Sequence, residues 1–104
     1  MSLGCWKDSI PRAMEELEHR MKYLGWHKFQ HYYKSRENAI QKCFTAALYL
    51  KMDLFGVQDG GQCFGTNSSS ESYKINGKST DCLADGKGGP MANHVYKISI
   101  GIFI

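Results

Sequence analysis

The stretch Phe55-Gly56-Val57-Gln58-Asp59-Gly60-Gly61-Gln62-Cys63-Phe64 decides the fold class of this chain. Leu54 to Gln58 has the pattern of a buried strand, and Gln62 to Phe64 returns as its partner. Between them, Asp59-Gly60-Gly61 supplies residues that tolerate a positive φ, as a tight hairpin turn requires. We therefore predict a β-hairpin that carries Cys63 in its second strand.

The segment before this hairpin predicts the main helix, from Arg36 to Leu50. Ser35 is a good N-cap residue, and Glu37 lies in the first turn, where the helix dipole favours a negative charge. Apolar residues recur at the i, i+3, i+4 spacing of one helix face: Ala39, Ile40, Cys43, Phe44, Ala47 and Leu48. Because Cys43 belongs to this face, we expect its sulfur to point into the core.

Three further segments complete the predicted fold. Ile10 to Met21 has apolar residues at helical spacing, with its three glutamates mostly on the opposite face. Lys74 to Pro90 is rich in Gly, Asn, Asp and Lys, and we expect irregular backbone there. His94 to Ile100 alternates as a final strand with one buried face. Together these segments predict an α+β domain with one main helix packed on a small antiparallel sheet.

The composition limits the class of molecule. The 104 residues suffice for one domain, and the hydrophobic share of 42% excludes wholesale disorder. The formal net charge of +3 is too modest to argue for a nucleic-acid partner. Four cysteines without a Cys-x-x-Cys pair argue against a zinc site and for two disulfides, and hence for an oxidising compartment.

Other features bear on the location of the protein. Asn67-Ser68-Ser69 is a glycosylation sequon in a polar stretch, which fits a secreted surface loop. Met1 to Leu3 is too short for a secretory leader, and we expect it to be a start added to a mature domain. No apolar run is long enough to span a bilayer, so stable membrane insertion is not expected. We expect a secreted, extracellular protein.

Short motifs spread over nearly the whole chain carry a resemblance to one family. In chain order they are Gly4-Cys5-Trp6-Lys7-Asp8, Arg12-Ala13, Asn38-Ala39, Cys43, the Phe55–Cys63 stretch, Tyr73, Cys82, Gly88-Gly89-Pro90, Asn93 and Val95-Tyr96. This order resembles a WSC-type domain, and most closely a WSC-like module of secreted proteins in marine invertebrates. The resemblance implies a PAN-like α+β fold, extracellular binding that is often presumed to be of carbohydrate, and no known catalysis.

The resemblance also guides the division of the chain, whereas the pairing of the cysteines is predicted from their positions in the expected elements. It makes residues 1–104 a single WSC-like domain in which residues 20–36 are a basic aromatic insertion. We expect Cys43 to pair with Cys63, because the inward helix face meets the hairpin, and Cys5 with Cys82. Four cysteines allow three connectivities, so this pairing is a hypothesis. Trp6, beside Cys5, is expected to pack against a disulfide in the core.

The insertion, RMKYLGWHKFQHYYKSR, holds the main candidates for ligand contact. Five basic residues and five aromatic residues alternate in it without any acidic residue. Tyr23, Trp26, Tyr32 and Tyr33 could stack on sugar rings while the lysines attract acidic or sulfated glycans. The same chemistry could serve nucleic acid or an anionic membrane, and an alternative is that the aromatic residues fill the core. Two residues of the Gly-rich region join the candidate contacts: Asp85 and Asn93.

Other motifs argue against a metal site, a cofactor and catalysis. Gly77-Lys78-Ser79-Thr80 imitates a phosphate-binding loop but lacks its first glycine. The segment 81–89 lacks the alternating oxygen ligands of a calcium loop. His27 and His31 have helical spacing for a shared metal but no third ligand. No nucleophile, base and oxyanion donors are recognisable together, so we expect no enzyme.

The sequence therefore favours a secreted recognition module that binds carbohydrate or a cell-surface glycoconjugate. The alternative is a secreted effector, such as a toxin or defence protein, that acts on membranes or on a protein receptor. A third hypothesis is an assembly role in which the apolar C-terminal residues pair with another copy.

Overall fold

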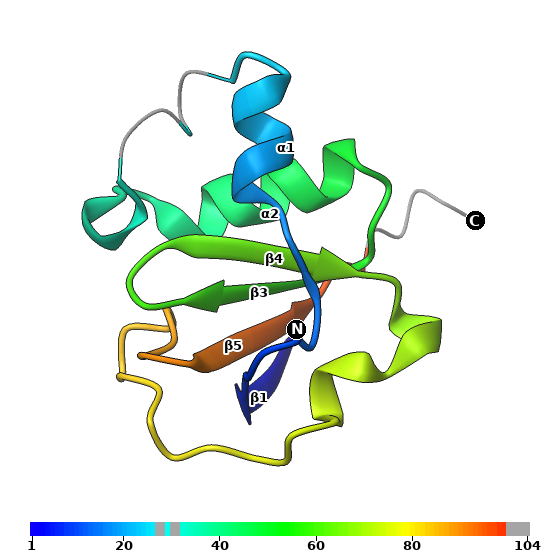
Figure 1. The fold of residues 1–104 in the computed structure, drawn as a ribbon, viewed down its shortest axis with the longest axis vertical. Coiled ribbons are helices and arrows are strands. Elements are labelled where there is room, and N and C mark those ends of the chain that lie inside the picture. The colour runs from blue at the N-terminus through cyan, green and yellow to red at the C-terminus, as the bar shows by residue number, and fades with distance from the viewer. Residues whose placement is uncertain (27–28, 30–31, 100–104) are drawn as a thin grey trace.

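A computed structural model describes residues 1–26, 29 and 32–99 of the chain. The fold is α+β, as predicted, with one antiparallel sheet of five strands in the order β1-β5-β3-β4-β2 (Figure 1). Its strands are β1 (Ser2–Lys7), β2 (Glu15–Glu16), β3 (Leu54–Gln58), β4 (Gln62–Thr66) and β5 (Ala92–Lys97). The helical elements are α1 (Glu18–Tyr23), α2 (Ala39–Tyr49) and the short 3-10 helices η2 (Tyr33–Ser35), η3 (Ser68–Ser70) and η4 (Ser72–Lys74).

The predicted hairpin is the centre of the sheet. Strands β3 and β4 pair over their whole length, and β5 pairs with the other side of β3. Asp59 and Gly60 take left-handed backbone, with φ of 51° and 92°, and the Gly61 N–H closes the turn on the Gln58 carbonyl at 3.1 Å. The final strand, β5, starts at Ala92, earlier than the predicted start at His94, and ends at Lys97. The predicted end, Ile100, lies outside the described residues.

Apolar side chains pack on both faces of the sheet, because successive residues of a strand point to opposite sides. The larger core lies between the sheet and the two α-helices, which sit together on one side of the strands (Figure 1). It includes Leu17, Met21, Phe29, Ala39, Cys43, Ala46, Ala47, Phe55, Val57 and Cys63. A smaller core on the other face is formed by Met14, Leu54, Phe64, Tyr73 and Val95.

Both disulfides have the pairing expected from the sequence. Cys43 of α2 is bonded to Cys63 of β4, inside the larger core. Cys5 of β1 is bonded to Cys82, which ties the edge strand to the Gly-rich loop. On the chain-entropy model, closing such loops contributes about 3 and about 4 kcal/mol to the free energy of unfolding. The first bridge therefore fastens α2 to the sheet, and the second fastens the Gly-rich loop to the edge strand β1.

The predicted helix over residues 10–21 is wrong for most of its length. Ile10 is exposed, and Glu15-Glu16 pair with β4 as the edge strand β2. Asp8 explains the difference, because its carboxylate accepts the backbone N–H groups of Ser9 and Ala13 and holds this stretch in a loop. The chain becomes helical only at Glu18, the first residue of α1.

Helix α2 begins at Ala39 and not at Arg36. Ser35, the expected N-cap, belongs to η2, and Asn38 takes left-handed backbone with φ of 51° just before the helix. Arg36 itself is extended. The reason is a tertiary contact: the Arg36 side chain turns into the core, away from the helix.

One buried ion pair joins both helical segments to the hairpin. Arg36 donates to the two carboxylate oxygens of Glu18 at 2.7 and 2.8 Å, and both side chains are at most 7% exposed. Arg36 also donates to the Gly61 carbonyl at 2.8 Å, and Glu18 accepts the Cys63 N–H at 2.9 Å. The guanidinium carbon lies 4.3 Å from the centre of the Phe29 ring. This corrects the sequence-based placement of Glu18 on a solvent-facing helix surface.

Removing one member of this pair should strongly destabilise the protein, because the other charge stays buried without a partner. We expect Glu18→Gln and Arg36→Met each to lower the free energy of unfolding by about 3–5 kcal/mol, measured by urea denaturation. The double variant should lose less than the sum of the two single variants.

The matched control is the exposed pair Arg20–Glu15, whose atoms are equally close at 2.7 Å. Solvent screens this pair, so Glu15→Gln should lower the free energy of unfolding by less than about 1 kcal/mol. Equal losses for Glu15→Gln and Glu18→Gln would contradict the importance of the buried pair.

Candidate functional site

The structure divides the aromatic residues of the insertion into two separate groups. Tyr32 and Tyr33 form a tilted pair with ring centroids 4.7 Å apart. Trp26 instead packs on Tyr49 of α2, with centroids 5.1 Å apart. Phe29 is buried beneath Arg36, as the core alternative predicted for part of the stretch. The candidate aromatic residues Trp26, Tyr32 and Tyr33 therefore do not stack together as one group.

The two histidines considered as metal ligands lie outside the part of the chain that the structure describes. His27 and His31, considered as metal ligands, are not among the described residues. Within residues 1–26, 29 and 32–99, no group of three His, Cys, Asp or Glu side chains is arranged to hold a metal ion.

Three segments that are distant in sequence meet around the turn of the central hairpin. The Lys34 carbonyl lies so close to Gly60 that a Cβ there would be 2.6 Å from it. The Lys34 ammonium lies 3.6 Å from the Asp59 carboxylate. On the other side, the Gly60 N–H donates to the Lys87 carbonyl at 3.2 Å. We call this region the hairpin-turn surface and define it by these side chains: Tyr32, Tyr33, Lys34, Asp59, Asp85 and Lys87.

The tyrosine pair gives this surface its aromatic character. Tyr32 is 62% exposed, and Tyr33 is half-buried beside it. Burial raises the pKa of the Tyr33 phenol above its ordinary value, and the neighbouring Tyr32 and Asp59 raise that pKa further, whereas Arg12 opposes them. The phenol therefore stays protonated at neutral pH and can donate a hydrogen bond.

Asp85 lies in the Gly-rich loop, where its carboxylate is exposed and accepts the Lys87 N–H at 3.0 Å. The Tyr96 hydroxyl holds this loop by donating to the Gly86 carbonyl at 2.7 Å. Burial, followed by the charge of Asp85, raises the pKa of Tyr96. The hydrogen bond from Tyr96 thus anchors the loop at Gly86, directly next to the exposed Asp85 carboxylate.

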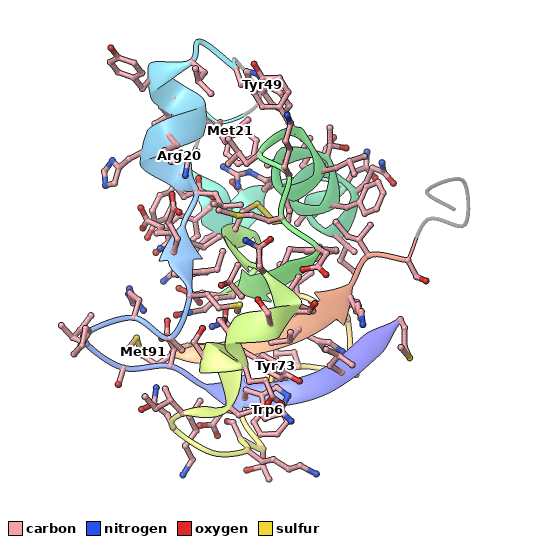
Figure 2. All side chains as sticks on the ribbon, turned by 90° about the vertical axis from the view of Figure 1, so that its right-hand side faces the viewer. Trp6, Arg20, Met21, Tyr49, Tyr73 and Met91 are labelled. Carbon is pink, nitrogen blue, oxygen red and sulfur yellow. A yellow bond between two sulfur atoms is a disulfide. The ribbon has the colours of Figure 1, made fainter. Side chains whose placement is uncertain are left out.

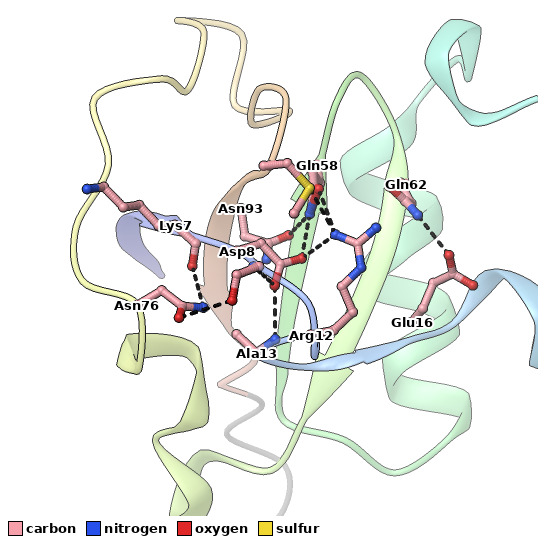
Figure 3. A network of polar contacts seen from close by, with 11 residues as sticks. Lys7, Asp8, Arg12, Ala13, Glu16, Gln58, Gln62, Asn76 and Asn93 are labelled. Atoms are coloured by element: carbon pink, nitrogen blue, oxygen red, sulfur yellow. Dashed lines mark hydrogen bonds and ion pairs between the residues drawn. The ribbon is translucent and has the colours of Figure 1, made fainter.

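Asn93 was expected to contact ligand, but it is only 1% exposed. It belongs to an internal polar network around Asp8 (Figure 3). Asp8 accepts from Arg12 at 2.8 Å and from Gln58 at 3.0 Å, and the same Gln58 amide donates to Asn93 at 3.4 Å. Because these groups satisfy one another, the network holds the loop after β1 against the hairpin and leaves Asn93 with a structural role.

Trp6, expected to lie in the core, is placed at the edge of the smaller core. Its ring packs edge-on against Tyr73, with centroids 5.4 Å apart, and its indole N–H donates to the Leu3 carbonyl at 2.9 Å. The ring is half-buried at the margin of the smaller core. Figure 2 shows Trp6 and Tyr73 at the opposite end of the molecule from Tyr49. Trp6 therefore packs against the smaller core, and its contact with a disulfide stays a prediction.

The glycosylation sequon lies on an exposed, well-anchored loop. Asn67 is exposed, and the following Ser68 donates through its N–H and its hydroxyl to the Asp53 carboxylate, each at 2.6 Å. The Ser68 hydroxyl is the main cause of a lowered pKa at Asp53. The acceptor side chain is thus reachable on a loop of defined position.

Two hollows lie elsewhere on the molecule, with volumes of about 310 and 350 Å³. Both include Lys97, at the end of β5, and neither includes a residue of the hairpin-turn surface. The hairpin-turn surface is therefore separate from both of these hollows.

Sequence reasoning missed two parts of this arrangement. It recognised Asp59 only as a turn residue and counted Lys34 only among the charges of the insertion. The signal that could have found them is the positive φ expected at Gly60, since a residue without Cβ permits another chain segment to pack against a turn.

Comparisons with protein-family models, with curated proteins and with solved structures find no match for this chain. The WSC-like resemblance therefore stays a prediction. None of the helices in the described part of the chain is long and apolar enough to cross a membrane.

The close packing at Gly60 can be tested with a pair of alanine variants. Gly60→Ala should lower the free energy of unfolding by about 2–4 kcal/mol, because it combines left-handed backbone with a clash at the Lys34 carbonyl. Gly77 has a similar φ of 82° but no neighbour within 4 Å, so Gly77→Ala should cost only about 1 kcal/mol. Urea denaturation measures both values, and equal losses would contradict the packing described here.

Proposed function

We propose that this protein is an extracellular, non-enzymatic recognition module that binds carbohydrate at the hairpin-turn surface. The observation that carries the proposal is the Tyr32–Tyr33 pair, with Tyr32 exposed and Tyr33 half-buried, beside the Lys34–Asp59 ion pair. A sugar presents an apolar ring face and several hydroxyl groups. Tyrosine offers both an apolar ring and a polar hydroxyl, so it suits a ligand of this mixed character.

The charged groups around the tyrosines supply the polar half of this chemistry. Lys34 and Asp59 are 3.6 Å apart, which is a loose contact, so sugar hydroxyls can donate to Asp59 while Lys34 donates to sugar oxygens. Asp85 adds an exposed carboxylate on the neighbouring loop. A few polar groups placed beside aromatic rings fix the orientation of a bound ligand.

The scaffold favours binding because it holds these side chains before the ligand arrives. The turn that carries Asp59 is anchored by the Cys43–Cys63 disulfide behind it and by backbone hydrogen bonds to the Gly-rich loop. Less conformational entropy is lost on binding when the contact residues are already ordered.

The proposal includes an extracellular location. The two disulfides fit an oxidising compartment, and the exposed Asn67 is accessible to glycosylation. The non-enzymatic part rests on the same surface: Asp59 faces an ammonium group, and the side chains that define the hairpin-turn surface include no serine, cysteine or histidine.

Glycosylation gives a direct test of the location. Expression through the secretory pathway of a eukaryotic cell should add one glycan at Asn67, seen as a mass that peptide N-glycosidase removes. Ser69→Ala keeps Asn67 but breaks the sequon, so this variant should be secreted without the added mass. An unmodified wild-type protein in the medium would contradict glycosylation at this site.

Ligand binding can be tested with a glycan array that includes neutral, acidic and sulfated sugars, followed by calorimetry on the glycans that bind. Tyr32→Ala and Tyr33→Ala should each weaken binding about fivefold or more, since loss of one aromatic stacking contact costs about 1–3 kcal/mol. Asp59→Asn should weaken binding as well, because it removes the charged acceptor.

Tyr23→Ala is the matched control, because Tyr23 is the most exposed of the predicted aromatic contacts and lies outside the hairpin-turn surface. It should bind glycan as the wild type does. The proposal fails if the oxidised wild-type protein binds no glycan at millimolar concentration, or if Tyr23→Ala weakens binding as much as Tyr32→Ala.

A further inference from the structure

A second surface, separate from the hairpin-turn surface, lies where the two α-helices end. Tyr23 is 91% exposed, Leu24 is 46% exposed and Tyr49 is 57% exposed. Tyr23 closes α1, and Tyr49 closes α2. Figure 2 shows Tyr49 at the same end of the molecule as α1, whose labelled residues are Arg20 and Met21.

Trp26 joins the two helix ends. The backbone N–H of Trp26 donates to the Met21 carbonyl at 3.1 Å, and this hydrogen bond folds the chain back over the end of α1. Its ring packs on Tyr49 with centroids 5.1 Å apart. We call the resulting region the helix-end surface and define it by these side chains: Lys22, Tyr23, Leu24, Trp26, Tyr49 and Lys51.

The charge on this surface has one sign. Residues 19–26 and 46–52 contain no acidic residue, and their cations are Lys22, Lys51 and Arg20, of which Arg20 is paired with Glu15 at 2.7 Å. Glu18, which comes just before, is buried against Arg36 and presents no charge to the outside. Lys22 and Lys51 are both exposed. An anionic partner would therefore meet no repulsion from within these two segments.

The side chains of the helix-end surface match the boundary of a lipid bilayer better than they match a sugar. Trp and Tyr place their rings at the level of the lipid headgroups, and Leu adds a purely apolar side chain that can enter the acyl region. Lysine keeps its ammonium in water while its methylene chain covers apolar surface. No side-chain carboxylate or amide is present in this set to pair with sugar hydroxyls.

We propose that the helix-end surface docks on anionic lipid membranes as a peripheral contact. Tyr23, Leu24 and Tyr49 enter the interface, whereas Trp26 stays half-buried against the larger core beside Tyr49. Lys22 and Lys51 lie against the anionic headgroups. The surface is distinct from the proposed carbohydrate site, so the two activities can be lost independently.

Sedimentation with vesicles tests this proposal on the full chain. The oxidised protein should sediment with phosphatidylcholine vesicles that contain phosphatidylserine and far less with phosphatidylcholine alone. Tyr23→Ser/Leu24→Ser should weaken vesicle binding at least tenfold. Lys22→Glu/Lys51→Glu should weaken it by about fivefold or more for each charge changed, and this electrostatic part of the binding should weaken as salt rises.

The matched control is Ile75→Ser/Leu83→Ser, which removes two exposed apolar side chains elsewhere on the molecule and should leave vesicle binding unchanged. A local reporter is also available, because the chain has two tryptophans. In a Trp6→Phe background, the emission of Trp26 should shift to shorter wavelength on adding the anionic vesicles.

Three results would overturn the proposal: no binding of the wild-type protein to phosphatidylserine vesicles, equal binding to both kinds of vesicle, or wild-type binding by Tyr23→Ser/Leu24→Ser. Glycan calorimetry on that double variant separates the two proposals. Retained glycan binding with lost vesicle binding supports both, whereas vesicle binding by the wild type without any glycan binding removes only the carbohydrate site.

Discussion

The buried ion pair between Glu18 and Arg36 is the contact on which the rest of the structure depends. Each member has a second partner in the hairpin, so the pair fixes the start of α1, the approach to α2 and the hairpin relative to one another. Two charges in a core are costly unless their hydrogen-bonding groups are satisfied. Here the Gly61 carbonyl and the Cys63 N–H supply those partners, and the Phe29 ring covers the guanidinium.

Local signals in the sequence predicted the centre of the fold. The Asp59-Gly60 turn and the apolar face of the main helix depend on neighbouring residues, and both appear in the structure. Glu18 was misplaced because its partner is 18 positions away and its burial cannot be read from periodicity. The helix predicted over residues 10–21 was wrong for a related reason, since hydrogen bonds to Asp8 and strand pairing with β4 overrode an apolar spacing that suits a helix.

The sequence predicted the chemical character of the candidate surfaces better than it predicted which residues the fold brings together there. Composition identified Tyr32 and Tyr33 as contact candidates, and the structure shows them paired. Asp59 joins them only because the fold brings the turn to Lys34, and Tyr49 faces Trp26 only because the two helices end together. Asn93 shows the opposite case, where a polar residue in a Gly-rich region is used inside the protein.

The position of the ion pair has a consequence for how this scaffold can change. Glu18 and Arg36 lie at the two ends of the segment that carries most of the exposed aromatic residues. Their ion pair therefore holds the two ends of this segment together. Substitutions at exposed positions between these two residues need not disturb the sheet, provided that Met21 and Phe29 stay apolar in the core and that Lys34 keeps its contact with the hairpin turn. The segment is thus a natural position for diversification, in which one disulfide-bonded framework can present different surfaces.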